Sequence, residues 1–402
     1  MRLLFISNLF PDTSQPWRGL DNVTLLHAMR AQRPEADIRV LCLRPGHGFW
    51  KGSRCDLKPR EGDEVLHPAY GWAPYVPKFG GMNDRLFALA VRRALSKLPA
   101  GWRPDALLVP WLFPDGCGVN RVPELAGVPM VSVAQGSDVH QYLDLPMRRR
   151  AILSLAKRAQ IITRSEDLRQ RLLRAGADAG QVRTVYNGVD TEMFHPGDSL
   201  TARVSLNLPL DGRLLLFVGN FLPVKGLDLL IQATALAARE MSEPLRLVMI
   251  GSGPLQKELT ALAKREGLPD DAVIWVGRKS PAEVAQFMRA CDAVCLSSHN
   301  EGVPNVLLES LASGRPFVTT DVGGISEILL SAPCGGRLVV GRDPAAYALS
   351  LTQTLTSVSD AKALSLFAAT LAWPRCAAVY WAALTLSHDD ALKQSLAPSA
   401  LH

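Results

Sequence analysis

Hydrophobic positions along the first half of the chain fall into short runs separated by longer amphipathic stretches. The runs predict buried strands, and the intervening stretches of about 10–15 residues predict helices. The expected strands are Arg2–Ser7, Ile38–Leu43, Asp105–Pro110, Pro129–Ala134, Gln160–Thr163 and Val182–Tyr186. The expected helices are Leu20–Gln32, Asp84–Leu98, Met147–Arg158 and Glu166–Ala175. This alternation is typical of a parallel sheet covered by helices on both faces.

The same pattern restarts after a turn-type cluster at Asn187-Gly188-Val189-Asp190. The second set of expected strands is Leu214–Val218, Arg246–Ile250, Ala272–Val276, Ala293–Ser297, Pro316–Thr320 and Arg337–Val340. The second set of expected helices is Leu227–Arg239, Leu255–Glu266, Ala282–Ala290 and Val306–Ser313. Because 402 residues exceed what one hydrophobic core usually organises, two domains are expected.

We therefore predict an α/β fold of two doubly wound, Rossmann-like domains, residues 1–190 and 191–372, followed by a helix and tail at 373–402. Open sheets of this type bind ligands at the carboxyl ends of their strands, so a shared cleft is expected there. The apolar stretch Ala377–Leu386 is too short to span a bilayer and is expected to pack in a core or interface. Residues 44–81 break the rhythm and are expected to be irregular.

Composition narrows the function classes. The N-terminal 195 residues contain 27 Lys and Arg against 19 Asp and Glu, whereas the remainder is almost neutral. Because only the N-terminal half is clearly basic, the charge distribution suits an anionic acceptor or membrane surface better than nucleic acid. Seven scattered cysteines without a Cys-x-x-Cys pair indicate reduced, mostly buried thiols. Because Met1-Arg2 leads directly into a predicted strand, we expect no signal peptide and a cytoplasmic protein.

Two glutamates, Glu301 and Glu309, bracket the strongest candidate site, directly after a predicted strand. Pro304 suits the first turn of a helix, which would leave the amides of residues 305–307 exposed at a helix N-terminus that favours anions. Glu309, two turns further on, could chelate a vicinal diol such as a ribose. A solvated helix with two incidental glutamates is the simpler alternative.

Other loops after strands contain glycine and a cation. In Gly219-Asn220-Phe221-Leu222-Pro223-Val224-Lys225, the glycine permits close backbone approach and Lys225 could neutralise a diphosphate. Gly251-Ser252-Gly253 lacks the third glycine of a dinucleotide fingerprint, so we interpret it as a tight turn. Gly323-Gly324 forms another turn before a helix.

The order and spacing of these motifs resemble the GT-B retaining glycosyltransferases of family four, over nearly the whole chain. The resemblance includes Trp111-Leu112-Phe113-Pro114-Asp115-Gly116, Gly136-Ser137-Asp138-Val139, Val224-Lys225-Gly226 and the Glu301/Glu309 pair. The variants present look most like bacterial enzymes of surface polysaccharides, including teichuronic-acid-type enzymes.

The resemblance implies a role for each matching residue in handling a nucleotide sugar. Glu309 would bind the ribose, Lys225 the diphosphate and Glu301 the hydroxyls of the donor sugar. Asp138 and Gln135 would act near the acceptor or the donor sugar, although a structural, helix-capping role for Asp138 is equally consistent with the sequence. The remaining donor-binding candidates are Gly19, Gly219, Asn220, Arg278, Gly302, Asn305, Val306 and Leu307.

Two positions depart from the family pattern. Asn220 stands where an arginine is usual, and Gln135 stands where many members have histidine. The expected activity is still metal-independent, retaining transfer of a hexosyl group to a glycan or lipid-linked acceptor, with no cofactor other than the donor. A nucleotide-sugar epimerase of the same fold and a non-catalytic sugar-nucleotide-binding homologue are the alternatives.

The acceptor side of the N-terminal half combines aromatic and basic residues. They are Phe49, Trp50, Lys51, Tyr70, Trp72, Tyr75, Lys78, Phe79, Arg92, Arg93 and Lys97, together with Arg148, Arg149, Arg150, Lys157 and Arg158 on one expected helix. This mixture suits sugar stacking or an anionic membrane interface. A solvated helix face with a small satellite core is the alternative.

Overall fold

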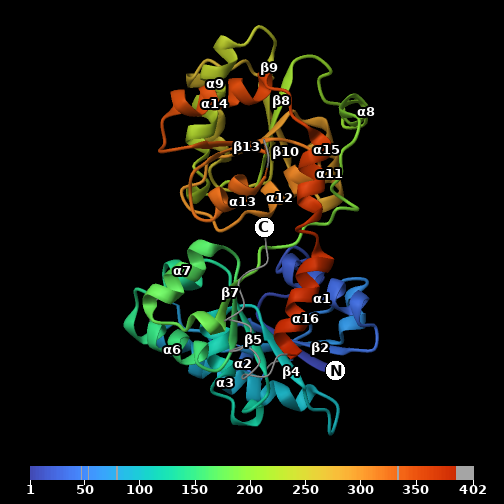
Figure 1. Ribbon diagram of the computed structural model, residues 1–402, viewed down its shortest axis with the longest axis vertical. Helices are drawn as coiled ribbons and strands as arrows, with labels where there is room; N and C mark the ends of the chain where they lie inside the picture. Colours follow the sequence, from blue (N-terminus) through green and yellow to red (C-terminus); the bar gives the residue numbers. More distant parts are fainter. Residues whose placement is uncertain (47, 53, 78–79, 333–334, 386–402) are drawn as a thin grey trace. The chain divides into compact units, whose positions relative to one another are not determined.

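A computed structural model describes residues 1–402 except 47, 53, 78–79, 333–334 and 386–402 (Figure 1). The chain divides into two compact units. Unit 1 comprises Met1–Asn187 and the C-terminal segment from Trp373, and unit 2 comprises Gly188–Ala372. Within the described ranges, no helix combines the length and the apolar composition needed to cross a membrane.

Unit 1 contains a seven-stranded parallel sheet in the order β3-β2-β1-β4-β5-β6-β7. The strands are β1 Arg2–Ser7, β2 Asp37–Pro45, β3 Pro68–Ala73, β4 Ala106–Val109, β5 Met130–Ala134, β6 Gln160–Thr163 and β7 Val182–Thr184. The helices are α1 Leu20–Gln32, α2 Gly48–Lys51, α3 Asn83–Ala94, α4 Cys117–Val119, α5 Ser137–His140, α6 Pro146–Ala156, α7 Glu166–Ala175 and α16 Trp373–Thr385. Because β1 and β4 are neighbours while β2 and β3 extend the other way, the strand order reverses between β1 and β4.

Unit 2 contains a six-stranded parallel sheet in the order β10-β9-β8-β11-β12-β13. The strands are β8 Arg213–Val218, β9 Leu245–Ile250, β10 Val273–Gly277, β11 Ala293–Leu296, β12 Phe317–Thr320 and β13 Gly336–Val339. The helices are α8 Ser199–Ser205, α9 Leu227–Glu240, α10 Gln256–Arg265, α11 Pro281–Ala290, α12 Asn305–Ala312, α13 Ile325–Ser331, α14 Pro344–Thr356 and α15 Ala361–Ala369.

The two doubly wound sheets confirm the predicted fold class. The irregular character expected for residues 44–81 is wrong in part, because Pro68–Ala73 forms the edge strand β3. Its sequence PAYGWA has weak intrinsic strand preference, since proline and glycine disfavour strands. Pairing along β2 from Val40 to Pro45 holds it in the sheet, so tertiary context overrides local preference.

Helix α16 completes the hydrophobic core of unit 1, although the rest of that unit ends at Asn187, 186 positions before Trp373. Figure 1 shows α16 in red beside α1 in blue. The buried Trp381 donates an indole hydrogen bond to the carbonyl of Met29 at 2.9 Å, and Arg33 lies 4.8 Å from its ring centre. The Ala377–Leu386 stretch is predicted to pack in a core or an interface, and its described part packs in the core of unit 1.

Candidate functional site

Lys225 and Glu301, 76 positions apart in sequence, meet at the carboxyl ends of the unit 2 strands. Lys225 ends the short turn after β8, and Glu301 lies in the loop between β11 and α12. Their Nζ and Oε1 atoms are 2.5 Å apart, with 24% and 14% of the side chains exposed. The pair is therefore reachable by a ligand and only partly screened by water. The sequence proposed both residues for one site, and the structure brings them together.

Ser298 holds the Glu301 carboxylate and was not among the predicted site residues. Its hydroxyl donates to Oε1 of Glu301 at 2.6 Å, and its carbonyl accepts a 2.7 Å hydrogen bond from the Thr320 hydroxyl. Ser298 and Thr320 are each only 1% exposed. A hydroxyl three positions before a loop glutamate was the available sequence signal, but serine is too common in loops for that spacing to stand out.

Two glycines allow the loops of this site to approach each other. At Gly323, φ is +60° and a Cβ would lie 1.8 Å from the carbonyl oxygen of Glu301. At Gly226, φ is +55° and a Cβ would lie 2.3 Å from the carbonyl oxygen of Ser297. The amide of Gly324 also donates to the carbonyl of Gly302 at 3.2 Å. Larger side chains at Gly226 or Gly323 would separate the loops and move Lys225 or Glu301.

The helix after Glu301 begins at Asn305, one residue earlier than the predicted Val306, and Pro304 lies at its N-cap rather than inside its first turn. The prediction that the amides of residues 305–307 are exposed is wrong for Leu307, whose amide donates to the carbonyl of Pro304 at 3.0 Å. Asn305 and Val306 remain in the first turn, where helical amides lack an acceptor four residues earlier in the helix. Glu309 lies one turn further along α12 and is half-buried.

A second part of the predicted site follows β8, β9 and β10. Gly219 is half-buried and Asn220 is exposed. A Cβ at Gly251 would lie 1.9 Å from the carbonyl oxygen of Gly219, so the two strand ends nearly touch. Arg278 is exposed and its Nε donates to the Ser252 hydroxyl at 2.8 Å. These side chains could contact a ligand that extends along this edge of the sheet.

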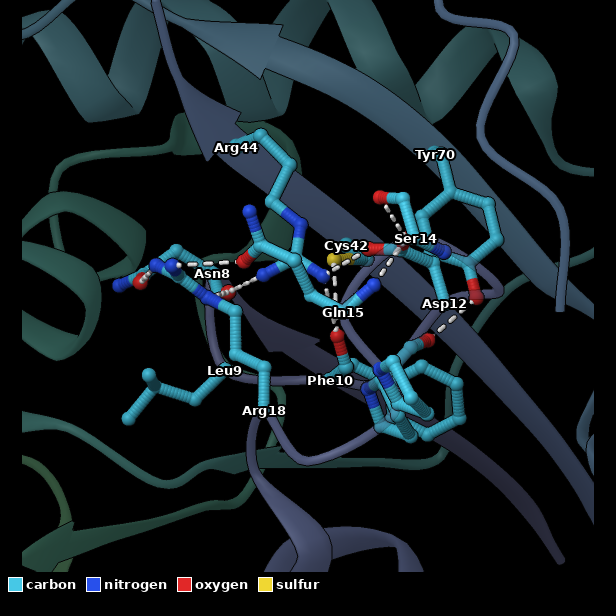
Figure 2. A network of polar contacts seen from close by, with 12 residues as sticks. Asn8, Leu9, Phe10, Asp12, Ser14, Gln15, Arg18, Cys42, Arg44 and Tyr70 are labelled. Carbon is cyan, nitrogen blue, oxygen red and sulfur yellow. Dashed lines mark hydrogen bonds and ion pairs between the residues drawn. The ribbon is translucent and has the colours of Figure 1, made fainter. Parts of the chain in front are cut away.

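In unit 1, Gly19 marks the N-terminus of α1 in a left-handed conformation with φ of +66°. A Cβ there would lie 2.4 Å from the carbonyl oxygen of Leu9, so the β1–α1 loop folds tightly over its own start. A buried ion pair between Arg44 and Asp12 supports this loop, and Arg44 also donates to the carbonyls of Asn8 and Phe10 (Figure 2). The network orders the backbone that precedes Gly19.

Gln135 and Asp138 form a backbone-organising cluster at the end of β5. The Asp138 carboxylate accepts from the amides of Leu112, Gln135 and Gly136 at 3.1, 3.0 and 2.9 Å. Gln135 donates through Nε2 to the carbonyl of Pro110 at 3.1 Å. Asp138 is fully buried, and its contacts with backbone amides favour the structural alternative over direct contact with the acceptor or the donor sugar. Burial raises the pKa of this carboxyl from 3.8 to about 6.

A second buried carboxylate, Asp115, ties β1 to the loop after β4. It accepts from the Ser7 hydroxyl at 2.9 Å and from the amide and side chain of Asn8. Burial raises the pKa of Asp115 to about 6. Asn8 and Asp115 also border a pocket of about 340 Å³ in unit 1.

Comparison with known proteins decides the family. Residues 18–193 match the model of Glycosyltransferase Family 4, and residues 198–368 match that of Glycosyl transferases group 1. A D-inositol 3-phosphate glycosyltransferase from Acidothermus cellulolyticus is 33% identical over 76% of this chain and 73% of its own length. The chain belongs to the group 1 glycosyltransferases. This agrees with the family resemblance of its motifs.

Two further proteins resemble this glycosyltransferase along most of its length. The putative teichuronic acid biosynthesis glycosyltransferase TuaC of Bacillus subtilis is 26% identical, covering 82% of this chain and 83% of its own. The crystal structure of Anabaena HepE in complex with UDP superposes with a TM-score of 0.70 at 20% identity, covering 96% and 100% of the two chains. Together with the two parallel sheets, this likeness shows that the glycosyltransferase has the GT-B fold.

Proposed function

We propose that this glycosyltransferase moves a hexosyl group from a nucleoside diphosphate sugar to a carbohydrate or lipid-linked acceptor in surface polysaccharide synthesis. The single observation that supports the donor is the Lys225–Glu301 pair, a cation and a hydroxyl-binding carboxylate at one sheet edge. Without a donor, the carboxylate satisfies the lysine. With a donor, Lys225 would turn to the diphosphate and Glu301 to the sugar hydroxyls.

The transfer is proposed to retain the anomeric configuration and to require no divalent metal. The bond between the anomeric carbon and the phosphate oxygen breaks, and the acceptor oxygen bonds to the same face of the sugar. The acceptor proton passes to the leaving phosphate oxygen. Lys225 and the first turn of α12 would stabilise the developing diphosphate charge, and preorganised groups of this kind contribute several kcal/mol in enzymes.

The remaining donor contacts are proposed from their positions along the unit 2 sheet edge. Glu309 would accept two hydrogen bonds from the ribose diol, and Gly219, Gly302 and Asn305 would place backbone groups near the phosphates. Arg278 would reach the base. Glu309→Gln is therefore expected to weaken UDP binding about tenfold, because one oxygen acceptor becomes a donor. Unchanged affinity by isothermal titration would remove the ribose assignment.

The acceptor class is proposed from unit 1 and from the names of two relatives. One relative acts on D-inositol 3-phosphate and the other serves teichuronic acid biosynthesis, so both names involve acidic carbohydrates. The basic balance of the first half suits an anionic acceptor better than nucleic acid. We propose action in the cytoplasm, with exposed Trp50 and the neighbouring bases available to an anionic membrane surface. Salt-sensitive sedimentation with anionic liposomes tests that association.

The proposal is tested by screening UDP, GDP and ADP sugars for binding, then measuring product formation with and without acceptors. Transfer that continues in EDTA and an NMR time course showing the donor's anomeric configuration in the product support the proposal. An inverted product contradicts retention, and dependence on added Mg²⁺ or Mn²⁺ contradicts metal independence. Conversion of the donor sugar without any acceptor would instead support the epimerase alternative, and binding without turnover would support a sensor.

A further inference from the structure

The loops that carry Lys225 and Glu301 are joined through the main chain as well as through these side chains. The Ser297 hydroxyl donates to the carbonyl of Lys225 at 3.0 Å, and the amide of His299 donates to the carbonyl of Val224 at 2.8 Å. Ser297 follows β11 directly and is fully buried. The position of the Lys225 side chain therefore depends on how firmly the turn after β8 is held against the end of β11.

Arg342, from the loop after β13, reaches both of these segments. Its Nη1 donates to the carbonyl of Ser297 at 2.8 Å, and its Nη2 donates to the carbonyl of Gly226 at 3.4 Å. Nη2 also lies 3.4 Å from a carboxylate oxygen of Asp228, but 66% of that side chain is exposed, so this ion pair is weak. Because a guanidinium donates from several nitrogens in one plane, a single side chain can bridge carbonyl groups of two loops.

The backbone that presents Arg342 is fixed on both sides. Gly341 has a φ of +78°, a left-handed turn that suits glycine. Asp343 is the N-cap of α14 and accepts from two amides in the first turn of that helix, both at 3.2 Å. The buried Tyr347 of α14 donates its hydroxyl to this region, 3.1 Å from the carbonyl oxygen of Leu296 at the end of β11. The guanidinium is therefore held beside the end of β11 by its own loop.

Gly226 makes room for the bridge. A Cβ at this position would lie 2.4 Å from Nη2 of Arg342 and 2.3 Å from the carbonyl oxygen of Ser297. The left-handed φ of +55° also favours glycine there. Arg342 can therefore contact both carbonyl groups only because residue 226 has no side chain.

We propose that Arg342 is a positioning residue for the transfer reaction, and that its bridge between the two loops fixes Lys225 where the diphosphate binds. The inference rests on the proposed function, which assigns the donor diphosphate to Lys225. Arg342 donates to the main chain and acts through Lys225. Since a small displacement of a preorganised cation weakens its contact with the substrate, loss of the bridge should weaken binding of the diphosphate and spare that of the nucleoside.

Matched nucleotides test the assignment in the full-length protein by isothermal titration. The probes are UDP with UMP, GDP with GMP and ADP with AMP, and the pair whose diphosphate binds most tightly is used throughout. Arg342→Gln is expected to weaken binding of the diphosphate about tenfold and that of the monophosphate less than about twofold. Arg342→Lys should recover part of the loss, because an ammonium group can donate to the carbonyls but lacks the planar fork.

The double variant with Lys225→Ala shows whether Arg342 acts through the lysine. In the Lys225→Ala background, Arg342→Gln should cost little further affinity for the diphosphate. Additive losses overturn the assignment. Equal losses for the diphosphate and the monophosphate also overturn it, since they would indicate a general disturbance of unit 2, and thermal melts of each variant measure such a disturbance separately.

Arg337→Gln is the matched control, because Arg337 is an exposed arginine of β13, and it should leave both affinities unchanged. Asp228→Asn removes the ion pair but keeps the carbonyl bridge, so a loss as large as that of Arg342→Gln would overturn the bridge. If the unsubstituted protein binds no diphosphate more tightly than its monophosphate, the donor assignment of Lys225 fails together with this inference. Discrimination that is lost in Arg342→Gln, in a protein that transfers no sugar, would reject the transferase proposal alone.

Discussion

Units 1 and 2 both place charged side chains at the carboxyl ends of parallel strands, but they bury these charges to different degrees. In unit 2, the side chains of Lys225 and Glu301 are 24% and 14% exposed. In unit 1, Asp138 and Asp115 are fully buried and accept hydrogen bonds mainly from loop backbone and short side chains. A charged residue at a strand end is therefore not necessarily a ligand-binding residue. The exposed fraction of its side chain and the group to which it is hydrogen-bonded identify the ones that can bind a ligand.

The difference follows from what each carboxylate must satisfy. A buried carboxylate needs several donors to offset its desolvation, and Asp138 obtains them from three backbone amides. Its lone pairs are then committed to shaping loops. Glu301 receives a hydroxyl and a flexible lysine, both of which can rotate toward another partner. Unit 2 thus holds contacts that a ligand can replace, and unit 1 holds fixed ones.

The largest expected effect comes from Trp381→Ala, which should disrupt unit 1 while sparing unit 2. Removing this buried ring from α16 is expected to cost about 3–5 kcal/mol of unfolding free energy. Hydrogen exchange followed by mass spectrometry should show faster exchange in α1 and β1 and unchanged protection in β8 and β11. The exposed Arg375→Ala on the same helix is the control. Equal loss of protection in both units would mean that they do not unfold separately.

Lys225→Ala should sharpen the contrast in the opposite direction by reducing activity without reducing stability. Loss of one preorganised cation at the leaving group is expected to lower kcat about 10²- to 10³-fold. Initial rates with a saturating acceptor measure this effect, and thermal melts check the fold. Lys257→Ala, an exposed lysine of α10, controls for the change of charge in unit 2. Less than a threefold loss of kcat would contradict the diphosphate role.

Asp138→Asn should change how the free energy of unfolding depends on pH, because the buried carboxyl can titrate and an amide cannot. Because the folded-state pKa of about 6 exceeds the ordinary value of 3.8 for an aspartate, the folded protein binds the proton more tightly than the unfolded chain does. The contribution of Asp138 to the free energy of unfolding therefore falls by about 3 kcal/mol as pH rises from about 4 to above 6. The asparagine variant lacks this component, so its destabilisation relative to the parent should be smaller at pH 7 than at pH 4.5. Urea melts at both pH values measure the difference, and a pH-independent difference would contradict the shift.

Ser298→Ala should have the smallest effect, because Ser298 acts through Glu301 rather than on the substrate. Loss of one hydrogen bond to a charged group is expected to reduce kcat/KM about tenfold. The kcat/KM values of Glu301→Gln and of the double variant show whether Ser298 acts through Glu301. If Ser298 positions Glu301, its substitution should cost little more in the glutamine background. Additive losses would show that Ser298 has a separate role.

The amino-acid sequence by itself determined the two-unit α/β plan. Parallel strands buried on both faces read as continuous apolar runs, so a local signal suffices to find β1, β6 and β11. The glycine turns, Lys225 and Glu301 were also predictable, because they follow those runs at the strand ends where ligands bind. The resemblance of these motifs to a known glycosyltransferase family added the expected reaction, transfer of a sugar from a nucleotide donor.

Only the tertiary structure decided which of these polar residues face a ligand. Strand β3 depends on pairing with β2, and the burial of Asp138 depends on the distant Leu112 backbone. Likewise, Thr320 at the end of β12 holds the loop in which Ser298 meets Glu301, and Arg148 from α6 reaches the ring of Phe113 in the loop after β4. Burial and hydrogen-bond partners arise from segments far apart in sequence, so local pattern can propose a charged residue for a site but cannot tell whether that charge is exposed or already satisfied.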